Sequence, residues 1–289
     1  MHNPPPVSVE HYENFPVASW LCPPALRPAV RAIYWFARTA DDIADEGDAP
    51  AEARQALLQH YRDDLSQAAS GRPGSGRWAA VFDPLAAVIA TNRLPVPLLE
   101  AMMDAFEEDT RHAGYADRVA LLQYCSRSAN PIGRLLLHLH GIDDATLLAR
   151  SDAVCSALQL INFWQDLSVD MPRGRVYIPR ADAAAHGTTP AACLQSPHAD
   201  ASRALVRDLC AWAHELMTAG SPIALAVPGR VGWELRFVVQ GGLRILAKID
   251  AMNFASFARR PRLHTVDHLV IGARALTMRP SLPEPTRTA

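Results

Sequence analysis

One stretch of the sequence decides how the rest is interpreted: Gln159-Leu-Ile-Asn162-Phe-Trp-Gln165-Asp166-Leu-Ser-Val-Asp170. Asn162, Asp166 and Asp170 are each four residues apart, so on a helix they form one oxygen-bearing stripe. The residues between them are mostly apolar. A polar stripe in so apolar a helix is expected to face a cavity, although a single stripe of this kind is also compatible with a solvated helix face.

A second acidic stripe lies about 120 residues earlier, in Tyr34-Trp-Phe-Ala-Arg38-Thr-Ala-Asp41-Asp42-Ile-Ala-Asp45-Glu46. Asp41 and Asp45 are four residues apart, and Arg38 and Tyr34 share roughly their face. Two like charges at this spacing cost a few tenths of a kcal/mol, and Asp is a poor helix former. The arrangement therefore predicts a compensating interaction at this face.

The remaining sequence is typical of an all-α protein. Clusters of Pro and Gly separate segments in which apolar residues recur every three or four positions. We expect a single helical domain over residues 1–276, followed by a Pro-rich, disordered tail over 277–289. The expected helices are 25–46, 50–69, 78–92, 97–112, 117–140, 144–171, 197–220, 229–256 and 264–276, with a further short helix possible within 8–20.

Composition excludes several classes of protein. The 28 Lys and Arg residues against 30 Asp and Glu give a formal charge of −2, which excludes a nucleic-acid binder that works by bulk positive charge. No run approaches 18 apolar residues, and the first residues do not resemble a signal peptide. Five scattered cysteines predict reduced, mostly buried thiols. These features favour a cytoplasmic protein.

The two aspartate stripes together suggest metal chemistry. Hard oxygen ligands suit Mg²⁺, which proteins commonly hold with one or two carboxylates plus substrate phosphate oxygens. The absence of His and Cys from both stripes argues against zinc. Facing helices of a bundle would bring the stripes together. Mg²⁺ held there could neutralise a leaving diphosphate, and the resulting carbocation would need a dry, aromatic-lined pocket.

Three blocks give the chain a family resemblance: Asp41-Asp42-Ile-Ala-Asp45; Tyr124-Cys-Ser-Arg-Ser-Ala-Asn-Pro-Ile-Gly133; and Gln159 to Asp170 followed by Arg175-Val-Tyr177-Ile-Pro179. They resemble, in the same order, the signatures of the squalene/phytoene synthase family, the head-to-head prenyltransferases. The resemblance extends over roughly residues 10–275. It implies an isoprenoid-synthase-type helical bundle around a central apolar cavity.

The resemblance also implies roles for individual residues. Asp41 and Asp45 would bind Mg²⁺ from one side, and Asp166 and Asp170, with Asn162, from the other, for a total of two or three ions. The remaining candidates would contact the diphosphate or the hydrocarbon: Arg38, Gln159, Gln165, Arg175, Tyr34, Tyr124, His11 and Phe15. Ordinary alternatives stay open, namely a salt bridge from Arg38 to Asp42, a loop role for Arg175, and core packing for both tyrosines.

Other polar residues receive structural interpretations. Asp42 points about 100° away from Asp41, so a salt-bridge role is as compatible with the sequence as a ligand role. His138 and His140 are interpreted as core or interfacial, and Glu107 to Asp109 as a solvated face, with Asp109 the one that matches a family acidic position. Pro131 is expected to kink its helix near Gly133.

Within the family, the opening residues 9–19 and the stretch Gly174-Arg-Val-Tyr177 look most like the branch that converts presqualene diphosphate to hydroxysqualene by adding water. The family usually has Arg or Glu where this chain has Gln165, and we connect this neutral residue with water quenching. No reductant such as NADPH is expected.

The alternative functions are condensation of two allylic diphosphates and a role as a non-catalytic assembly factor of the same fold. A water-insoluble substrate would also favour peripheral membrane contact.

Overall fold

The computed structural model describes residues 21–47, 49–111 and 114–279, and within these ranges the chain is helical and contains no strand. The first six helices are α1 (Arg27–Asp45), α2 (Ala51–Ala69), α3 (Ala79–Asn92), α4 (Val96–Asp109), α5 (Arg118–Ser128) and α6 (Asn130–Leu139). The others are α7 (Ala145–Gln165), α8 (Leu167–Asp170), the 3-10 turn η2 (Met171–Arg173), α9 (Arg180–Ala185), α10 (Pro190–Gln195), α11 (Asp200–Gly220), α12 (Ile223–Ala226), α13 (Gly229–Ala251) and α14 (Thr265–Thr277). The expected all-α class is confirmed.

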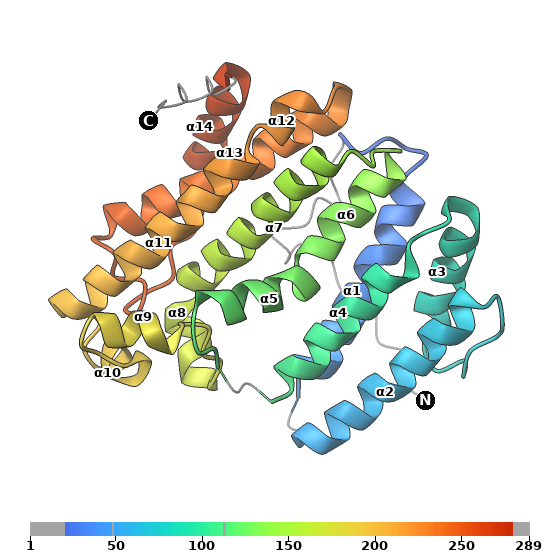
Figure 1. Cartoon of the computed structure of the whole chain (residues 1–289), viewed down its shortest axis with the longest axis horizontal. Coiled ribbons are helices and arrows are strands. Elements are labelled where there is room, and N and C mark those ends of the chain that lie inside the picture. The colour runs from blue at the N-terminus through green and yellow to red at the C-terminus, as the bar shows by residue number, and fades with distance from the viewer. Residues whose placement is uncertain (1–20, 48, 112–113, 280–289) are drawn as a thin grey trace, which may run out of the picture.

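The helices pack around two hydrophobic cores. One core joins α1 to α4, drawn in blue and teal in Figure 1, and the other joins α5, α7, α11 and α13, drawn from green to orange. Helix α6 contributes to both, with Leu135 in the first core and Leu137 in the second. The seam between the cores therefore lies between α1 on one side and α7 on the other.

Helix α1 turns its apolar face away from this seam. Ile33, Phe36, Ala40 and Ala44 are buried at three- and four-residue spacing. Pro28 lies in the first turn, where its missing N–H removes no intrahelical hydrogen bond. The opposite face is left to the polar residues of the first acidic stripe.

Helix α7 forms the other wall. The side chain of Asp144 caps its start by accepting a hydrogen bond from the Leu147 amide at 2.9 Å. Helix α11 packs alongside α7 over much of its length. Phe163 and Trp164 are buried in the core, while another face of α7 packs on α6 and lines a cavity that α1 also lines.

The nine expected long helices are present, with two corrections. The segment 117–140 is divided at Ala129, not near Gly133, because Pro131 disfavours helical continuation just upstream of itself. The segment 144–171 is interrupted at Asp166, which ends α7 and precedes α8. The short helices α9, α10 and α12 were not anticipated. The expected helix within 8–20 and most of the expected tail lie outside the described residues.

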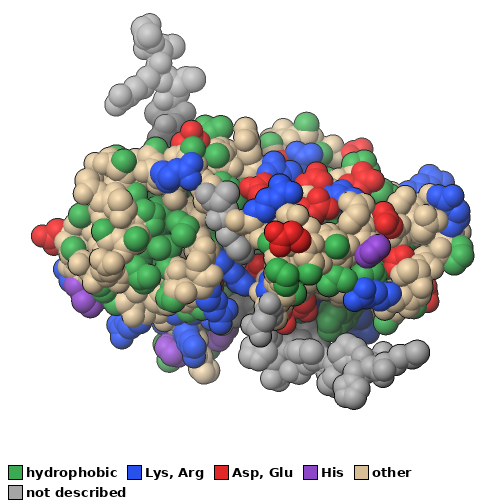
Figure 2. All heavy atoms as spheres, turned by 90° about the horizontal axis from the view of Figure 1, so that it is seen from below, with side chains coloured by type: hydrophobic (Ala, Val, Ile, Leu, Met, Phe, Trp, Pro, Cys, Tyr) green, Lys and Arg blue, Asp and Glu red, His purple; other side chains and the backbone are tan. Residues whose placement is uncertain are grey.

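All five cysteines are free, and four of them are buried, as expected. In the described part of the chain, no helix combines the length and apolarity needed to cross a bilayer. Figure 2 shows a face on which acidic and basic side chains mingle in one half and hydrophobic side chains gather in the other.

Candidate active site

The first acidic stripe lies on α1 beside Arg38. The guanidinium of Arg38 contacts Asp41 at 3.3 Å, Asp42 at 2.6 Å and Glu46 at 2.9 Å. The salt bridge to Asp42 that the spacing allowed is therefore present. Arg38 and Asp41 both line two neighbouring cavities, so an anion that entered either cavity would contact the Arg38 guanidinium.

The second acidic stripe keeps its spacing although the helix breaks within it. The Asp166 amide donates to the Asn162 carbonyl at 3.0 Å, and the Asp170 amide donates to the Asp166 carbonyl at 2.9 Å. These two bonds have the same four-residue period as an α-helix, so the three side chains remain one turn apart. The Asp166 carboxylate forms an ion pair with Arg260.

Arg175 connects the two stripes. Its backbone N–H donates to the Asp170 carbonyl at 3.1 Å, while its guanidinium reaches the Asp45 carboxylate at 3.0 Å and the Asp45 carbonyl at 3.2 Å. The preceding Gly174 has a φ of 80°, a conformation that glycine adopts without strain. The turn after the second stripe thus docks directly on the first stripe, across the seam between the cores.

Burial and like charge raise the pKa of carboxyl groups on both sides of the seam. The pKa of Asp41 rises to about 7, mainly because the group is desolvated and then because Asp45 is near. The pKa of Asp170 rises to about 6, again through burial and then through Asp166. Such a group favours either a proton or a cation.

These carboxylates fit Mg²⁺ by the chemistry of their donors, since all are hard oxygens and their mutual repulsion is what a divalent cation would relieve. Within the described ranges, no three Asp, Glu, His or Cys side chains lie close enough to hold an ion on their own. Three carboxylates contact arginines instead: Asp41 with Arg38, Asp45 with Arg175, and Asp166 with Arg260. Binding of Mg²⁺ would therefore require these arginines to release the carboxylates.

The raised pKa values predict a pH dependence. As pH rises from about 4 to about 7, Asp41 must ionise against its environment, so the folded state loses stability relative to the unfolded chain. An Asp41→Asn variant lacks this loss. We therefore expect urea unfolding to show wild type falling in stability relative to the variant up to about pH 7 and levelling off above it.

The same proton competes with a metal ion. If these carboxyl groups bind Mg²⁺, the affinity measured by calorimetry should weaken as pH falls below about 7, because the ion would have to displace protons from Asp41 and Asp170. An affinity that stays constant between about pH 5 and pH 8 would contradict the prediction.

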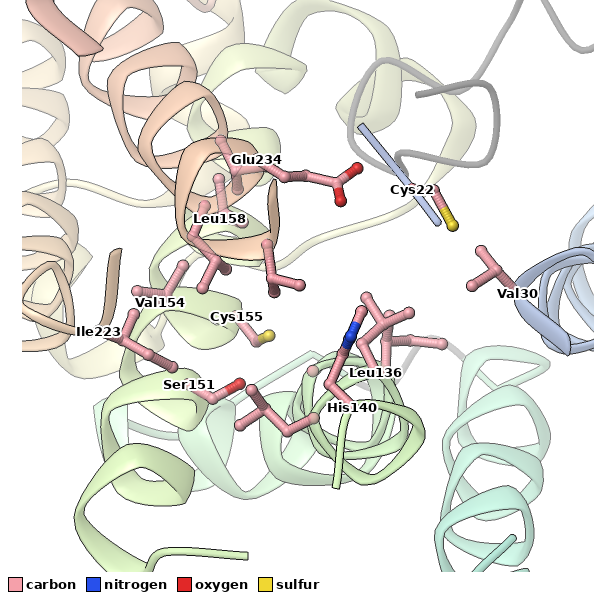
Figure 3. Close-up of a pocket in the computed structure, with 16 residues that line it drawn as sticks. Cys22, Val30, Leu136, His140, Ser151, Val154, Cys155, Leu158, Ile223 and Glu234 are labelled. Atoms are coloured by element: carbon pink, nitrogen blue, oxygen red, sulfur yellow. The ribbon is translucent and has the colours of Figure 1, made fainter. Parts of the chain in front are cut away.

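An apolar cavity extends from the carboxylates into the protein. Its inner chamber, shown in Figure 3, has a volume of about 100 Å³, and His140, Ser151 and Glu234 are among its few polar lining residues. The outer chamber reaches Asp41. Both chambers are lined by Ile132, Cys155 and Leu158. The two chambers therefore adjoin at these residues, with the outer chamber nearer the acidic seam and the inner chamber nearer His140 at the end of α6.

Aromatic side chains line the carboxylate end. Tyr34 and Tyr124 both face the outer chamber. Tyr124 is buried and donates to the Asp109 carboxylate at 2.9 Å. The expectation of a solvated Asp109 is therefore wrong: the group is buried, and desolvation holds its pKa well above the usual range.

Two further aromatics stand behind this pair. Tyr177 stacks on Phe163 with ring centroids 3.7 Å apart and planes within 6°, and it lies 6.2 Å from the ring of Tyr124. The stack fixes the Arg175-to-Pro179 segment against α7. It therefore helps hold Arg175 in place.

Gln165 does not lie where the sequence suggested. Its side chain is buried and donates to the Pro261 carbonyl at 2.9 Å, and it lines neither chamber. The expected diphosphate contact is therefore corrected, because the helix ends at this residue and turns the amide toward the 259–264 segment. Gln165 anchors the loop whose Arg260 pairs with Asp166.

We expect Gln165→Ala to lower the free energy of unfolding by about 1–3 kcal/mol, because the Pro261 carbonyl loses its partner in a buried position. Chemical denaturation measures this change. Gln159→Ala is the matched control, since Gln159 lines the outer chamber and its loss should cost less. An equal effect for both variants would contradict the anchoring role.

The other candidates occupy different surroundings. Asn162 lies one turn from Gln159, on the stripe described above. His138 contacts the Asn92 carbonyl at 2.9 Å, which confirms its interfacial role. Glu107 pairs with Arg62 and Glu108 with Arg127 on partly exposed surfaces. His11 and Phe15 lie outside the described residues, so their expected roles stay predictions.

Sequence reasoning misplaced one residue of this site and missed another. Asp109 matched a family acidic position but was assigned to a solvated face, although it continues the buried spacing of Met102 and Phe106 on α4. Arg260 gave no local signal, since it lies in a loop 94 residues beyond its partner Asp166.

Comparison with known proteins agrees with this architecture. The family model described as squalene/phytoene synthase matches residues 9–267. A hydroxysqualene synthase from Sinorhizobium fredii is 32% identical over 253 residues, covering 87% of this chain and 83% of the relative. One from Zymomonas mobilis is 37% identical over 180 residues, covering 61% of this chain and only 58% of the relative.

Among solved structures, squalene synthase HpnC from Alicyclobacillus acidocaldarius superposes with a TM-score of 0.76 at 34% identity, covering 84% of this chain and 90% of that chain. Proteins named presqualene diphosphate synthase and phytoene synthase also match over a shorter stretch.

Proposed function

Because the chain belongs to the squalene/phytoene synthase family, we propose that it ionises presqualene diphosphate with the help of Mg²⁺ and adds water to the rearranged cation. The products are hydroxysqualene and diphosphate, and the reaction consumes no reductant. We further propose that the protein acts in the cytoplasm, in an isoprenoid pathway that leads to hopanoid-type products. The likeness to relatives named hydroxysqualene synthase supports this choice within the family.

One observation carries the proposal: the two acidic stripes come from different cores, meet across one seam through Arg175, and the first stripe borders a mainly apolar cavity at Asp41. The polar seam matches a charged diphosphate in chemistry, and the mainly apolar lining of the adjoining chambers matches a hydrocarbon chain. The seam alone or the cavity alone would not select a molecule that has both a diphosphate and a long hydrocarbon chain.

Cationic side chains would orient the diphosphate. Arg38 and Arg175 stand on opposite sides of the seam and already contact carboxylates there. Charge-assisted hydrogen bonds from both would fix the leaving group. Asp41, Asp45, Asp166 and Asp170, with Asn162, would hold Mg²⁺, which supplies positive charge against the departing diphosphate.

The carbon chemistry would take place beside the aromatic residues. The carbon–oxygen bond breaks with its electron pair leaving on diphosphate, and the ring faces of Tyr34 and Tyr124 can stabilise the cation by their quadrupoles. A water oxygen then bonds to the cationic carbon and its proton passes to diphosphate or solvent. Most of the described lining is apolar, so few groups on the walls would compete with water for the cation.

The second candidate is condensation of two allylic diphosphates to presqualene diphosphate or phytoene. It is favoured by the match to proteins of those names, and the same carboxylates would serve it. A third, a non-catalytic assembly factor, is disfavoured because Asp41, Asp45, Asp166 and Asp170 are all present.

The test incubates purified protein with Mg²⁺ and presqualene diphosphate without NADPH, and identifies products by mass spectrometry. A parallel reaction contains farnesyl diphosphate alone. Hydroxysqualene in the first and no product in the second supports water quenching. Turnover of farnesyl diphosphate supports condensation. No turnover in either, together with no Mg²⁺-dependent diphosphate binding, would favour the assembly factor.

A further inference from the structure

Helix α14 carries an apolar stripe on its outer face. Val266, Leu269, Ala273 and Leu276 recur at spacings of three, four and three residues, so they lie along one side of the helix. Val266 is 67% exposed, Leu269 72% and Leu276 69%. These four residues, here called the outer stripe, form an apolar surface that no described part of the chain covers.

The inner face of the same helix packs against the rest of the protein. Ile271 and Ala275 are buried toward α13, and Asp267 is buried between Arg244 and Lys248 at 2.6 Å from each. Gly272 lies against Phe237, which is itself 40% exposed and adds to the apolar surface. The helix is thus firmly attached on one side and apolar on the other.

The segment that carries the outer stripe is rich in arginine. From 255 to 279 the sequence contains five arginines and a single acidic residue, Asp267, whose charge is already matched by Arg244 and Lys248. Arg274 is exposed on α14 itself, and Arg279 is exposed just beyond it. The chain as a whole has a formal charge of −2, so this segment is strongly basic against an acidic background.

The loop before α14 extends the basic surface. A groove between the second half of α13 and this loop is lined by Arg244, Lys248, Arg259, Arg260, Arg262 and His264. Arg259 and Arg262 are exposed. Residues 259–264, here called the basic loop, also contain Arg260, which pairs with Asp166 of the candidate active site.

We propose that the outer stripe and the basic loop dock this protein on an anionic lipid bilayer. Leucines and valine enter the apolar edge of the bilayer, and the arginines meet anionic headgroups. A helix of thirteen residues is about 20 Å long, enough to lie in the interface but too short to cross it.

Charge favours a bilayer over a second copy of the chain. A twofold dimer through the outer stripe would place the same arginines of both copies near one another, which opposes association. Anionic lipid offers the opposite charge over a wide area. The role of this docking rests on the proposed function. An isoprenoid substrate would dissolve in the membrane and would reach the candidate active site near Arg260.

The experiment is co-sedimentation of the full chain with vesicles. We expect binding to vesicles of phosphatidylcholine mixed with phosphatidylglycerol, and much weaker binding to phosphatidylcholine alone. A double variant, Leu269→Ser with Leu276→Ser, should reduce partitioning at least about tenfold. A second, Arg259→Gln with Arg262→Gln, should reduce it about tenfold, and only on anionic vesicles.

Matched controls change the same kinds of residue elsewhere. Val119→Ser removes an apolar side chain that is 64% exposed on α5, and Arg31→Gln with Arg72→Gln removes two exposed arginines. Both controls should partition as wild type does. Thermal unfolding of every variant excludes a loss caused by misfolding.

Equal binding to both kinds of vesicle by all variants, or no binding by wild type, would overturn the proposal. So would a dimer in light scattering that the leucine variant abolishes without any vesicle binding, because the stripe would then belong to a second copy. Turnover of presqualene diphosphate in detergent micelles is measured separately. Vesicle binding without turnover would reject the proposed reaction and leave the docking surface standing.

Discussion

Replacing Asp45 with asparagine is expected to lower kcat/KM for presqualene diphosphate by about a thousandfold or more. The change removes one carboxylate from the proposed metal-binding set, and metal stabilisation of a leaving group is worth several kcal/mol. It also removes the ion-pair partner of Arg175, which Asp45 holds at 3.0 Å. Mass spectrometry of product formed under steady-state conditions measures the loss.

Asp42→Asn provides the control for this variant. Asp42 lies on the same helix and carries the same charge, but it pairs with Arg38 at 2.6 Å and lines neither the seam nor the outer chamber. We expect an effect of less than about tenfold, because removing a partly exposed ion pair costs little. If Asp42→Asn proved as damaging as Asp45→Asn, the assignment of Asp45 to metal binding would lose its support.

Replacing Leu158 with tryptophan is expected to lower the rate of substrate turnover by about a hundredfold or more. Leu158 lines both chambers of the apolar cavity, so a larger side chain there separates the acidic seam from the space for the hydrocarbon. Displacing a substrate by about 1 Å can already cost a hundredfold in rate. Mg²⁺-dependent binding of inorganic diphosphate should persist, because the seam itself is unchanged.

Leu158→Met is the matched control, since it keeps the volume of the side chain and should cost less than about 1.5 kcal/mol of stability. Circular dichroism and thermal unfolding must show that the tryptophan variant is folded. Turnover by a folded Leu158→Trp protein at the wild-type rate would mean that the substrate does not use both chambers.

The sequence predicted the long helices well because burial along them follows the helical period. On α1, the same period that buries Phe36 and Ala40 turns Asp41 and Asp45 toward the seam. The second stripe was predicted for a continuous helix that does not exist. The prediction of its spacing nevertheless held, because the hydrogen bonds at Asp166 and Asp170 keep the four-residue period through the break.

The errors arose where tertiary contacts outweigh local pattern. Gln165 is adjacent to a candidate ligand, yet one residue on a helix rotates a side chain by about 100°, and this one reaches Pro261. Arg260 meets Asp166 only because the loop after α13 returns to the end of α7. No residue spacing within either segment indicates this ion pair, so it could not be predicted from the sequence alone.

The seam between the two cores has a consequence for folding cooperativity. Asp41 and Asp45 lie on α1 of the first core, while Asp166 caps the end of α7 and Asp170 lies on α8, so a ligand that contacts both stripes acts as a clasp between two packing units. A clasp of this kind stabilises only the assembled arrangement. Amide hydrogen exchange in α1 and α8 should therefore slow together when Mg²⁺ and diphosphate bind, although more than a hundred residues separate the two helices.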